Sequence, residues 1–281
     1  MNAAKSVLSK VDLTGKTALV VGGTAGIGQG IAIQLAQLNA NVVLAGRNAK
    51  AAQDIIKGFP NSNSHSFEKV DFSLLKDTRR FANEVKQKYK HVDYLVITAG
   101  IMRMTGRQET EEGIDDKMAV HYYSRARLIL DLIPAMKKGS RVLSVLAAAQ
   151  GSLVTETDFD LKNSYSVYNA SQACPLYNDL LVDKLSTLYP DVVFFHALPG
   201  MVKTNLIEGL PWYLRIPTKL MTPFATTIED CGAYMCSGFL APERSSGYYL
   251  LGPKGEVVEK LKVHTDELRD KVYQHTLDLI D

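Results

Sequence analysis

The sequence predicts an α/β protein built on one doubly wound parallel sheet of about seven strands, with helices on both faces. Short apolar runs alternate with longer segments whose apolar residues recur at helical spacing, and six such alternations follow one another with short connections. The run at 17–21 is apolar, as a strand covered on both sides is. We find no linker, repeat or low-complexity tract, so residues 1–281 are expected to form one domain.

The individual elements follow from these two patterns and from the residues that end them. The first strand is expected at 17–21, where an apolar run ends in glycines, and the first helix at 27–39. By the same criteria, strands are expected at 41–45, 64–70, 92–98, 141–146 and 192–197, and helices at 48–58, 74–89, 111–137 (broken near Pro134) and 166–188. Residues 1–13 would be an N-terminal extension and 257–281 a tail, with helical spacing over 263–280.

The alternation stops between residues 203 and 226. This stretch is apolar and irregular, and its large apolar residues are Trp212, Tyr213, Leu214, Ile216, Leu220, Met221 and Phe224. An insertion of this length inside a compact domain is typical of a functional lid, helical or irregular, which would enclose a substrate. The alternatives are a packed or oligomer-facing segment and an amphipathic patch that touches lipid.

Composition argues against several functions. The net charge is +2, and the basic residues are scattered in the manner of solvated helix ends, as at Lys86, Lys88, Lys90 and Lys137-Lys138. A nucleic-acid surface is therefore not expected. Three cysteines without the spacing of metal ligands (Cys174, Cys231 and Cys236) indicate reduced thiols and no metal site.

Nothing in the sequence suggests a membrane protein. No segment approaches the roughly 20 apolar residues that span a bilayer. Residues 1–16 lack the apolar core of a secretory signal. We expect a soluble, cytoplasmic protein.

The first strand runs into the glycine motif G-x-x-x-G-x-G, which predicts a Rossmann-type dinucleotide site. Gly22 permits a tight turn, Gly26 lets the backbone approach a pyrophosphate, and Gly28 allows close packing of helix and strand. The amides at the helix start then face the phosphates. The residues expected to bind the cofactor here are Gly22, Thr24, Ala25, Gly26, Ile27 and Gly28.

The end of the second strand favours NADP(H) over NAD(H). An acidic side chain at this position would bind the ribose 2′-hydroxyl, whereas an arginine favours a 2′-phosphate. The chain has Gly46, Arg47 and Asn48 here, so nothing acidic opposes that phosphate. The alternative is that Arg47 is a solvated residue of the first helical turn.

Asp71 and Phe72 close the third strand. Asp71 is placed to accept a hydrogen bond from the adenine amino group, with Phe72 beside it. The alternative role for Asp71 is the N-cap of the helix at 74–89, although Ser73 suits that role better.

Taken together, these motifs resemble the short-chain dehydrogenase/reductase family over most of residues 14–252. To the glycine motif and Asp71 the chain adds Thr98-Ala99-Gly100, the helix from Tyr168 to Gln172 and the loop at 199–204. The resemblance implies that Ala99 and Gly100 contact the nucleotide. It also implies that the loop holds the nicotinamide carboxamide through Pro199, Gly200, Val202 and Thr204.

Members of this family usually work through an Asn-Ser-Tyr-Lys tetrad, of which one residue remains. The resemblance places these four positions at His121, Ala147, Tyr168 and Gln172. In the family, the lysine binds the ribose and its charge lowers the tyrosine pKa. Gln172 can keep the ribose contact but supplies no charge, so Tyr168 would be a poor base at neutral pH. This favours carbonyl reduction, in which a neutral tyrosine is already the required acid, over alcohol oxidation.

Other residues offer compensation for the altered tetrad. His121 could relay protons or simply pack in its helix. Tyr165 lies one helical turn before Tyr168, so both could face one cleft, and either could be the acid. Tyr122 and Tyr123 are expected to pack, and Ser144 lies too early in its strand to replace the missing serine.

Three functions remain open at this stage. The first is an NADP(H)-dependent reductase acting on a carbonyl or activated double bond of a mostly apolar small molecule. The second is a non-redox catalyst of dehydration, isomerisation or cyclisation. The third is a catalytically silent NADP(H)-binding protein. Narrower resemblances point to the retinol-dehydrogenase-like branch and to divergent members of fungal secondary metabolism. Related proteins often form homodimers through the helices at 111–137 and 166–188, and monomers also occur.

Overall fold

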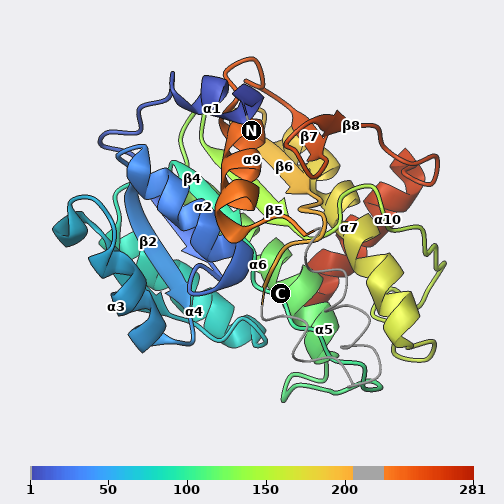
Figure 1. Ribbon diagram of the computed structural model, residues 1–281. Helices are drawn as coiled ribbons and strands as arrows, with labels where there is room; N and C mark the ends of the chain where they lie inside the picture. The colour runs from blue at the N-terminus through green and yellow to red at the C-terminus, as the bar shows by residue number, and fades with distance from the viewer. Residues whose placement is uncertain (1, 205–224) are drawn as a thin grey trace.

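One mostly parallel sheet organises the part of the chain that the computed structural model describes, residues 2–204 and 225–281 (Figure 1). The strand order is β3-β2-β1-β4-β5-β6-β7-β8, and only the β7–β8 pair is antiparallel. The strands are β1 (Thr17–Val21), β2 (Asn41–Gly46), β3 (Ser66–Lys69), β4 (Tyr94–Ile97), β5 (Arg141–Val145), β6 (Val193–Ala197), β7 (Tyr248–Leu251) and β8 (Val257–Val258). This is the expected doubly wound α/β fold. About seven strands were expected, and the described part of the chain has eight, of which the last is short.

Helices cover both faces of this sheet, and the central strands are apolar on both sides. In β1, for example, Ala18 and Val20 face one buried cluster while Leu19 and Val21 face the other. The first cluster is covered by α1 (Asn2–Leu8), α2 (Gly26–Gln37), α3 (Ala49–Lys57) and α9 (Ile228–Leu240). The second is covered by α4 (Leu75–Lys88), α6 (Ser124–Leu132), α7 (Val167–Leu188) and α10 (Asp266–Ile280).

The helix expected at 111–137 is shorter and more broken than the spacing predicted. Residues 111–115 form a turn in which Gly113 has a φ of +75°, and the Asp115 side chain accepts hydrogen bonds from the amides of Lys117 and Met118. The helix therefore begins at 116. It comprises α5 (Asp116–Met118), a π-helical turn η2 (Ala119–Tyr123), α6 and the short 3-10 helix η3 (Ile133–Ala135), which contains Pro134.

Helix α4 begins without the local cap that the sequence suggested. Ser73 does not cap it. Its amide and hydroxyl both donate to Asp71 Oδ1, at 3.0 and 2.7 Å. The free amides of Leu75 and Lys76 instead donate to the two carboxylate oxygens of Glu112, each at 2.7 Å. A remote glutamate therefore replaces the expected N-cap.

Helices α2 and α9 cross at two glycines. A Cβ on Gly30 would lie 2.2 Å from the carbonyl oxygen of Ile228, and a Cβ on Gly232 would lie 2.4 Å from the carbonyl of Gly30. The two backbones therefore pack with no room for a side chain between them. This contact fixes α9 against the helix that follows the glycine motif.

Helix α10 lies along α7 and reaches η2 and α6 (Figure 1). The Tyr122 hydroxyl lies 2.6 Å from Thr276 Oγ1, and Arg127 Nη1 donates to the Ile280 carbonyl at 2.6 Å. Lys184 of α7 pairs with Asp270 at 2.9 Å. The tail expected at 263–280 thus docks on the domain, over helices expected to form a dimer contact.

The predicted lid falls mostly outside the described residues, which exclude 205–224. Its two ends are described and lie together. The amide of Lys203 donates to the Thr226 carbonyl at 3.0 Å, and the amide of Thr226 donates to the Met201 carbonyl at 2.9 Å. Val202 and Thr226 thus pair as in a parallel sheet.

Two features are absent from residues 2–204 and 225–281: a membrane-spanning helix and a metal-binding cluster. No helix in this part is long and apolar enough to cross a membrane. Nor does it contain a cluster of three or more side chains suited to hold a metal ion. Cys174, Cys231 and Cys236 are buried, and none is in a disulfide with another described residue.

Candidate nucleotide and active site

A cavity of about 440 Å³ opens at the carboxyl ends of β1 to β4. The cavity brings together most of the residues predicted to bind a nucleotide: Gly22, Thr24, Ala25, Gly26, Ile27, Gly28, Arg47, Asp71, Phe72, Ala99, Gly100 and Thr204. The remaining predicted positions lie outside its wall: His121, Tyr165, Tyr168, Gln172, Asn48, Pro199, Gly200 and Val202.

The glycine motif forms a cradle that no other residue type fits. Gly22 has a φ of +82°, and a Cβ there would lie 2.6 Å from the amide nitrogen of Ala99. A Cβ on Gly28 would lie 2.3 Å from both the Gly22 carbonyl oxygen and Thr98 Oγ1. Helix α2 starts at Gly26. The methyl side chain of the preceding residue, Ala25, cannot accept hydrogen bonds from the first amides of the helix. These amides are thus left for a phosphate.

Arg47 lies at the β2 side of the cavity, with its side chain exposed. Among the described residues, none forms a hydrogen bond or ion pair with its guanidinium. The neighbouring Asn48 has a structural role, because its Oδ1 accepts a hydrogen bond from the amide of Ala51 at 3.0 Å and caps α3. Arg47 is therefore a cation without a partner among the described residues, at the position where a 2′-phosphate is expected.

The opposite side of the cavity holds an acid that the sequence did not single out. Asp116 lines the cavity with Arg103, to which its Oδ2 is ion-paired. Its Oδ1 is buried and accepts no hydrogen bond from the residues that the structure describes. The nearest ammonium is that of Lys117, at 3.8 Å. In the sequence Asp116 is one of two acids at a helix start, a pattern that suggests only a favourable helix dipole.

His121 lies in the π-helical turn and is held as a neutral imidazole. Its Nε2 accepts a hydrogen bond from the amide of Ile101 at 3.1 Å. Burial lowers the pKa of His121 to about 3, and the charges of Arg125 and Lys117 act in the same direction. A proton relay through the imidazolium near neutral pH is not supported by this environment. The His121 carbonyl accepts from Asn178 Nδ2 at 2.8 Å, which ties η2 to α7.

Arg125 is fully buried beneath the ends of β4 and β5, where sequence patterns did not place a charge. Its guanidinium donates to four neutral oxygens: Ser144 Oγ at 2.7 Å, and the carbonyls of Val145 at 2.9 Å, Ala99 at 2.6 Å and Val120 at 3.3 Å. Ser144 in turn donates to Asn178 Oδ1 at 2.8 Å. Burial lowers the pKa of Arg125 to about 10. Ser144 is thus fully engaged below the site, consistent with its position early in the strand.

The turn that carries Ala147, at the position of the missing serine, is held from below by a buried pair. His196 Nε2 accepts from the Ala147 amide at 3.3 Å, so its Nδ1 carries the proton that faces Asp179 Oδ1 at 2.5 Å. Asp179 Oδ2 accepts from the amide of Ala149 at 3.0 Å. Ala149 has a φ of +57°, in the left-handed region, which is costly for a residue with a Cβ. The pair therefore stabilises a strained turn.

The two candidate tyrosines differ in their surroundings. Helix α7 starts after the N-cap Ser166, so Tyr165 lies outside the helix. The expectation that Tyr165 lies one helical turn before Tyr168 is therefore wrong. The Tyr165 hydroxyl accepts from Lys117 Nζ at 2.9 Å. Burial raises the pKa of Tyr165 to about 12, and Asp115 adds to the shift. Tyr168 is 69% exposed.

Gln172 is directed to the turn after β5. Its Oε1 accepts from Ser152 Oγ at 3.1 Å. The amide NH₂ has no described partner, so it remains a donor for a ribose hydroxyl. Tyr122 and Tyr123 are fully buried, which confirms that they pack.

Comparison with known proteins agrees with this geometry. A family model described as short chain dehydrogenase matches residues 16–209. Oxidoreductase andH of Emericella variicolor is 35% identical over 228 residues, which cover 77% of this chain and 67% of that protein. Oxidoreductase AN1596 of Emericella nidulans is 30% identical, over 94% of this chain and 92% of that protein. The crystal structure of angucycline C-6 ketoreductase LanV with bound NADP has the same fold, with a TM-score of 0.65 at 21% identity over 87% of this chain and 96% of that one. The chain belongs to the short-chain dehydrogenase family.

Proposed function

We propose that the protein is an NADP(H)-dependent reductase that acts on a carbonyl or activated double bond of a mostly apolar small molecule. The observation that carries the proposal is the glycine-lined cavity with Arg47 as a free cation at its β2 side. The fit of a dinucleotide rests on the cradle at Gly22 and Gly28, which any Cβ would fill. LanV, which has the same fold, was crystallised with bound NADP.

Exposed apolar side chains on the loops at the carboxyl edge of the sheet support an apolar substrate. Large apolar side chains are exposed on the loops that follow β4, β5 and β6 and at the start of α7: Met102, Met104, Val154, Met201 and Tyr168. Exposed apolar groups gathered at one edge mark a binding surface. Methionine is a common choice where one surface must fit several shapes.

The protonation states of the site favour reduction. When bound, the nicotinamide supplies the hydride, and this chain must supply a proton to the carbonyl oxygen. A tyrosine hydroxyl with its ordinary pKa near 10 is already protonated at neutral pH, and burial raises the pKa of Tyr165 further, to about 12. Oxidation would require the phenolate as a base, which this environment disfavours.

The cofactor assignment is tested by comparing NADPH and NADH affinity for wild type and Arg47→Ala. A charge-assisted hydrogen bond contributes about 1.5–3 kcal/mol, so NADPH should bind roughly 10- to 100-fold more weakly to the variant. NADH affinity should not change. Lys50→Ala, an exposed cation on the first turn of α3, is the matched control. Tighter binding of NADH than of NADPH by the wild type would contradict the assignment.

The reaction class is tested by following reduced-nicotinamide absorbance while apolar aldehydes, ketones and enones are offered. Loss of absorbance with formation of the alcohol or saturated product is the expected result. Because Ala147 and Gln172 lack the family's serine and lysine, a non-redox reaction is the second candidate. Product formation without cofactor turnover would favour that second function.

A further inference from the structure

Arg125 is a fully buried arginine whose hydrogen-bond partners among the described residues are all neutral. They are the Ser144 hydroxyl and the carbonyls of Ala99, Val120 and Val145. Burial lowers the pKa of Arg125 to about 10, which still leaves the guanidinium protonated at neutral pH. The fold therefore encloses one full positive charge beneath the ends of β4 and β5.

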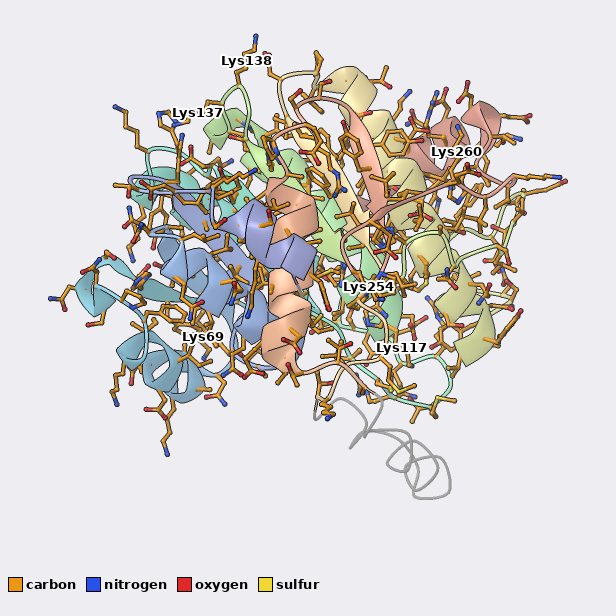
Figure 2. All side chains as sticks on the ribbon, turned by 45° about the horizontal axis from the view of Figure 1, so that its top comes forward. Lys69, Lys117, Lys137, Lys138, Lys254 and Lys260 are labelled. Carbon is orange, nitrogen blue, oxygen red and sulfur yellow. The ribbon has the colours of Figure 1, made fainter. Side chains whose placement is uncertain are left out.

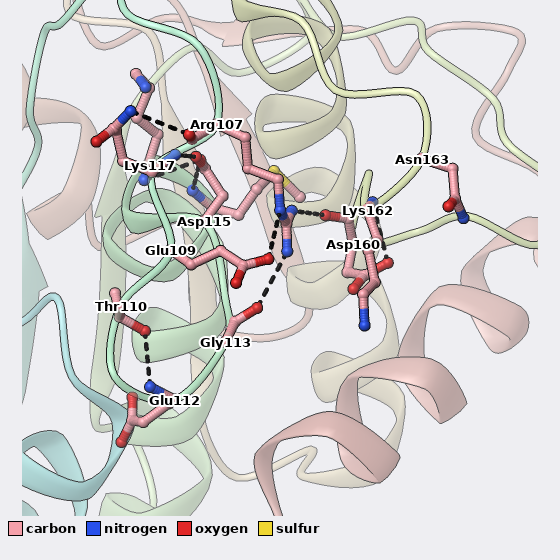
Figure 3. Close-up of polar contacts among 12 residues, drawn as sticks. Arg107, Glu109, Thr110, Glu112, Gly113, Asp115, Lys117, Asp160, Lys162 and Asn163 are labelled. Carbon is pink, nitrogen blue, oxygen red and sulfur yellow. Dashed lines mark hydrogen bonds and ion pairs between the residues drawn. The ribbon is translucent and has the colours of Figure 1, made fainter.

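Two other arginines at this edge of the sheet have acidic partners. Arg103 is ion-paired with Asp116 in the cavity wall. Arg107 pairs with Glu109 at 3.1 Å, and it also donates to two loop carbonyls (Figure 3). For Arg125, no carboxylate among the described residues shifts the pKa. A buried charge is costly when no counter-ion compensates it, so its retention beside a ligand cavity suggests a role toward the ligand.

The nearest buried acid below this edge is engaged elsewhere. The Asp179 carboxylate lies under the turn after β5, where it accepts hydrogen bonds from His196 Nδ1 at 2.5 Å and from the amide of Ala149 at 3.0 Å. It does not contribute to the pKa of Arg125. The charge of Arg125 is thus not paired with any carboxylate that the structure describes.

Arg125 lies directly behind the wall of the nucleotide cavity. Ala99 and Val120 line the cavity, and their carbonyls accept from Arg125 Nη2 at 2.6 Å and Nε at 3.3 Å. The charge also acts on His121, whose pKa is lowered first by burial and then by Arg125. His121 Nε2 in turn accepts from the amide of Ile101, another residue of the cavity wall. Because Arg125 itself does not line the cavity, it acts on a ligand through its electric field.

The ends of β4 and β5 are where the reacting half of the nucleotide is expected. In folds of this kind the nucleotide lies across the carboxyl ends of the strands, where the strand order reverses, here between β1 and β4. Arg47 marks the 2′-phosphate half at the end of β2, so the nicotinamide half is expected over β4 and β5. In Figure 2, Lys138, which precedes β5, lies at the opposite end of the molecule from Lys117 of α5. The strands therefore end on the α5 side, and Arg125 bonds the last residue of β5, Val145, there.

We propose that Arg125 makes the site bind NADPH in preference to NADP⁺, by holding a fixed positive charge beneath the nicotinamide subsite. The proposal rests on the proposed NADP(H)-dependent reductase function. The nicotinamide ring is neutral in NADPH and carries one positive charge in NADP⁺, whereas the phosphates of the two forms are the same. The guanidinium attracts the phosphates of both forms and repels only the oxidised ring. It thereby favours loading of the reduced cofactor and release of the oxidised one.

Burial gives this charge its reach. Charges on a protein surface are screened by salt over about 8–10 Å, whereas buried charges are screened much less. The interaction between two charges is also stronger in the protein interior than in water. Four hydrogen bonds hold the guanidinium of Arg125 in place, so the charge cannot turn out to solvent.

The test measures the dissociation constants of NADPH, NADP⁺ and 2′,5′-ADP for wild type, Arg125→Met and Arg125→Lys by calorimetry. The wild type should bind NADPH roughly 10-fold or more tightly than NADP⁺. Methionine removes the charge, so in Arg125→Met the two affinities should lie within about threefold of each other. Arg125→Lys keeps the charge and should keep most of the preference. The affinity for 2′,5′-ADP, which has no nicotinamide, should change little in either variant.

Arg127→Met is the matched control. Arg127 lies on the same helix and is nearly buried, but it pairs with Asp131 at 2.7 Å. This variant should keep the wild-type preference for NADPH. If Arg125→Met weakens both forms equally and keeps their ratio, the charge acts on the phosphates alone and the proposal is overturned. Equal affinities of the wild type for both forms would overturn it as well, whereas a wild type that binds neither form contradicts the proposed function itself.

A second measurement uses only the wild type, so it does not depend on the folding of the Arg125 variants. The ratio of the NADP⁺ and NADPH dissociation constants is compared at about 0.05 and about 0.5 M NaCl. Both affinities should fall with salt, but their ratio should persist, because the charge that separates them is buried. A ratio that collapses toward one at high salt would assign the preference to surface charges and remove Arg125 from it.

Discussion

The turn that carries Ala147 keeps its supporting residues although the family's serine is absent from it. Ala147 and Gln172 stand where the family usually has a serine and a lysine. The turn around Ala147 is nevertheless held by Asp179 and His196, both at most 1% exposed. The support below the turn thus remains although the hydroxyl above it is gone. This buried pair should matter to stability more than to the chemistry.

Asp179→Ala should destabilise the protein by about 3 kcal/mol, because it leaves the buried His196 Nδ1–H and Ala149 amide without acceptors. Denaturant unfolding followed by circular dichroism measures the change. Asp191→Ala, an exposed acid, is the control and should be neutral. A cost below about 1 kcal/mol would show that water or another group satisfies both donors.

The neutral His121 predicts an acid-sensitive fold. Its pKa is about 3 in the folded protein against 6.5 for an exposed imidazole, so the unfolded chain binds a proton that the folded chain does not. Its contribution to stability is present above about pH 6.5 and is lost as pH falls toward 3, by at most about 1.4 kcal/mol per pH unit.

Unfolding free energies of wild type and His121→Asn, measured between pH 4 and 7 (about the range of imidazole titration), test this expectation. Asparagine keeps an acceptor for the Ile101 amide, so the variant should lose less stability on acidification. His91→Asn controls for the general loss of a histidine. Parallel pH curves for wild type and His121→Asn would contradict the expectation.

At the scale of elements, apolar periodicity placed the first six strands within a few residues, because buried parallel strands are continuous apolar runs. It failed at 111–137, where Gly113 and Asp115 end a turn inside an apolar pattern that looks helical. It also missed β8, which is only two residues long. Helix α9 was missed as well, although Thr227 caps it with its side chain.

The candidate site also has some features that the sequence predicted and others that it did not. The nucleotide cradle was predictable because glycine positions and strand ends are local features of the chain. The contact of Lys117 with Tyr165 joins residues 48 positions apart, and spacing carries no signal for it. Arg125 was missed for a related reason, since its four acceptors are created only when β4, β5 and η2 meet.

The glycine contact between α2 and α9 gives a prediction at this scale. Gly232→Ala should destabilise the protein by about 1–3 kcal/mol, because the new Cβ would require one backbone to move away from the other. Thermal unfolding measures this, and weaker NADPH binding should accompany it, since α2 carries the phosphate-facing amides. Gly106→Ala, with nothing within 4 Å of the added Cβ, is the control. An unchanged melting temperature would mean that α9 shifts freely.

For the whole molecule, α10 determines which surfaces remain for assembly. It packs along α7, and its last turn bonds Arg127 of α6. A four-helix dimer through α6 and α7 would have to displace this helix, together with the buried Leu268 and Val272. We therefore expect a monomer.

Light scattering on the eluting protein should give the mass of one chain. Val272→Asp would place a charge in the α10 contact and should lower stability by about 3 kcal/mol or more, whereas the exposed Gln274→Asp should not. A wild-type dimer that is broken by substitutions on α7 beneath α10 would contradict the expected assembly.

The pairing of Val202 with Thr226 has a consequence for the evolution of this sequence. The chain leaves the sheet region and returns to it at one hydrogen-bonded point. Bringing the two ends of this segment together costs conformational entropy, and this cost grows only slowly with the length of the segment. Contacts outside the segment offset the cost. Because Val202 and Thr226 are paired by backbone hydrogen bonds, we expect the strand register to stay the same when residues 205–224 are exchanged for those of a relative. We expect that exchanging residues 205–224 would test whether substrate range and fold stability can be changed separately.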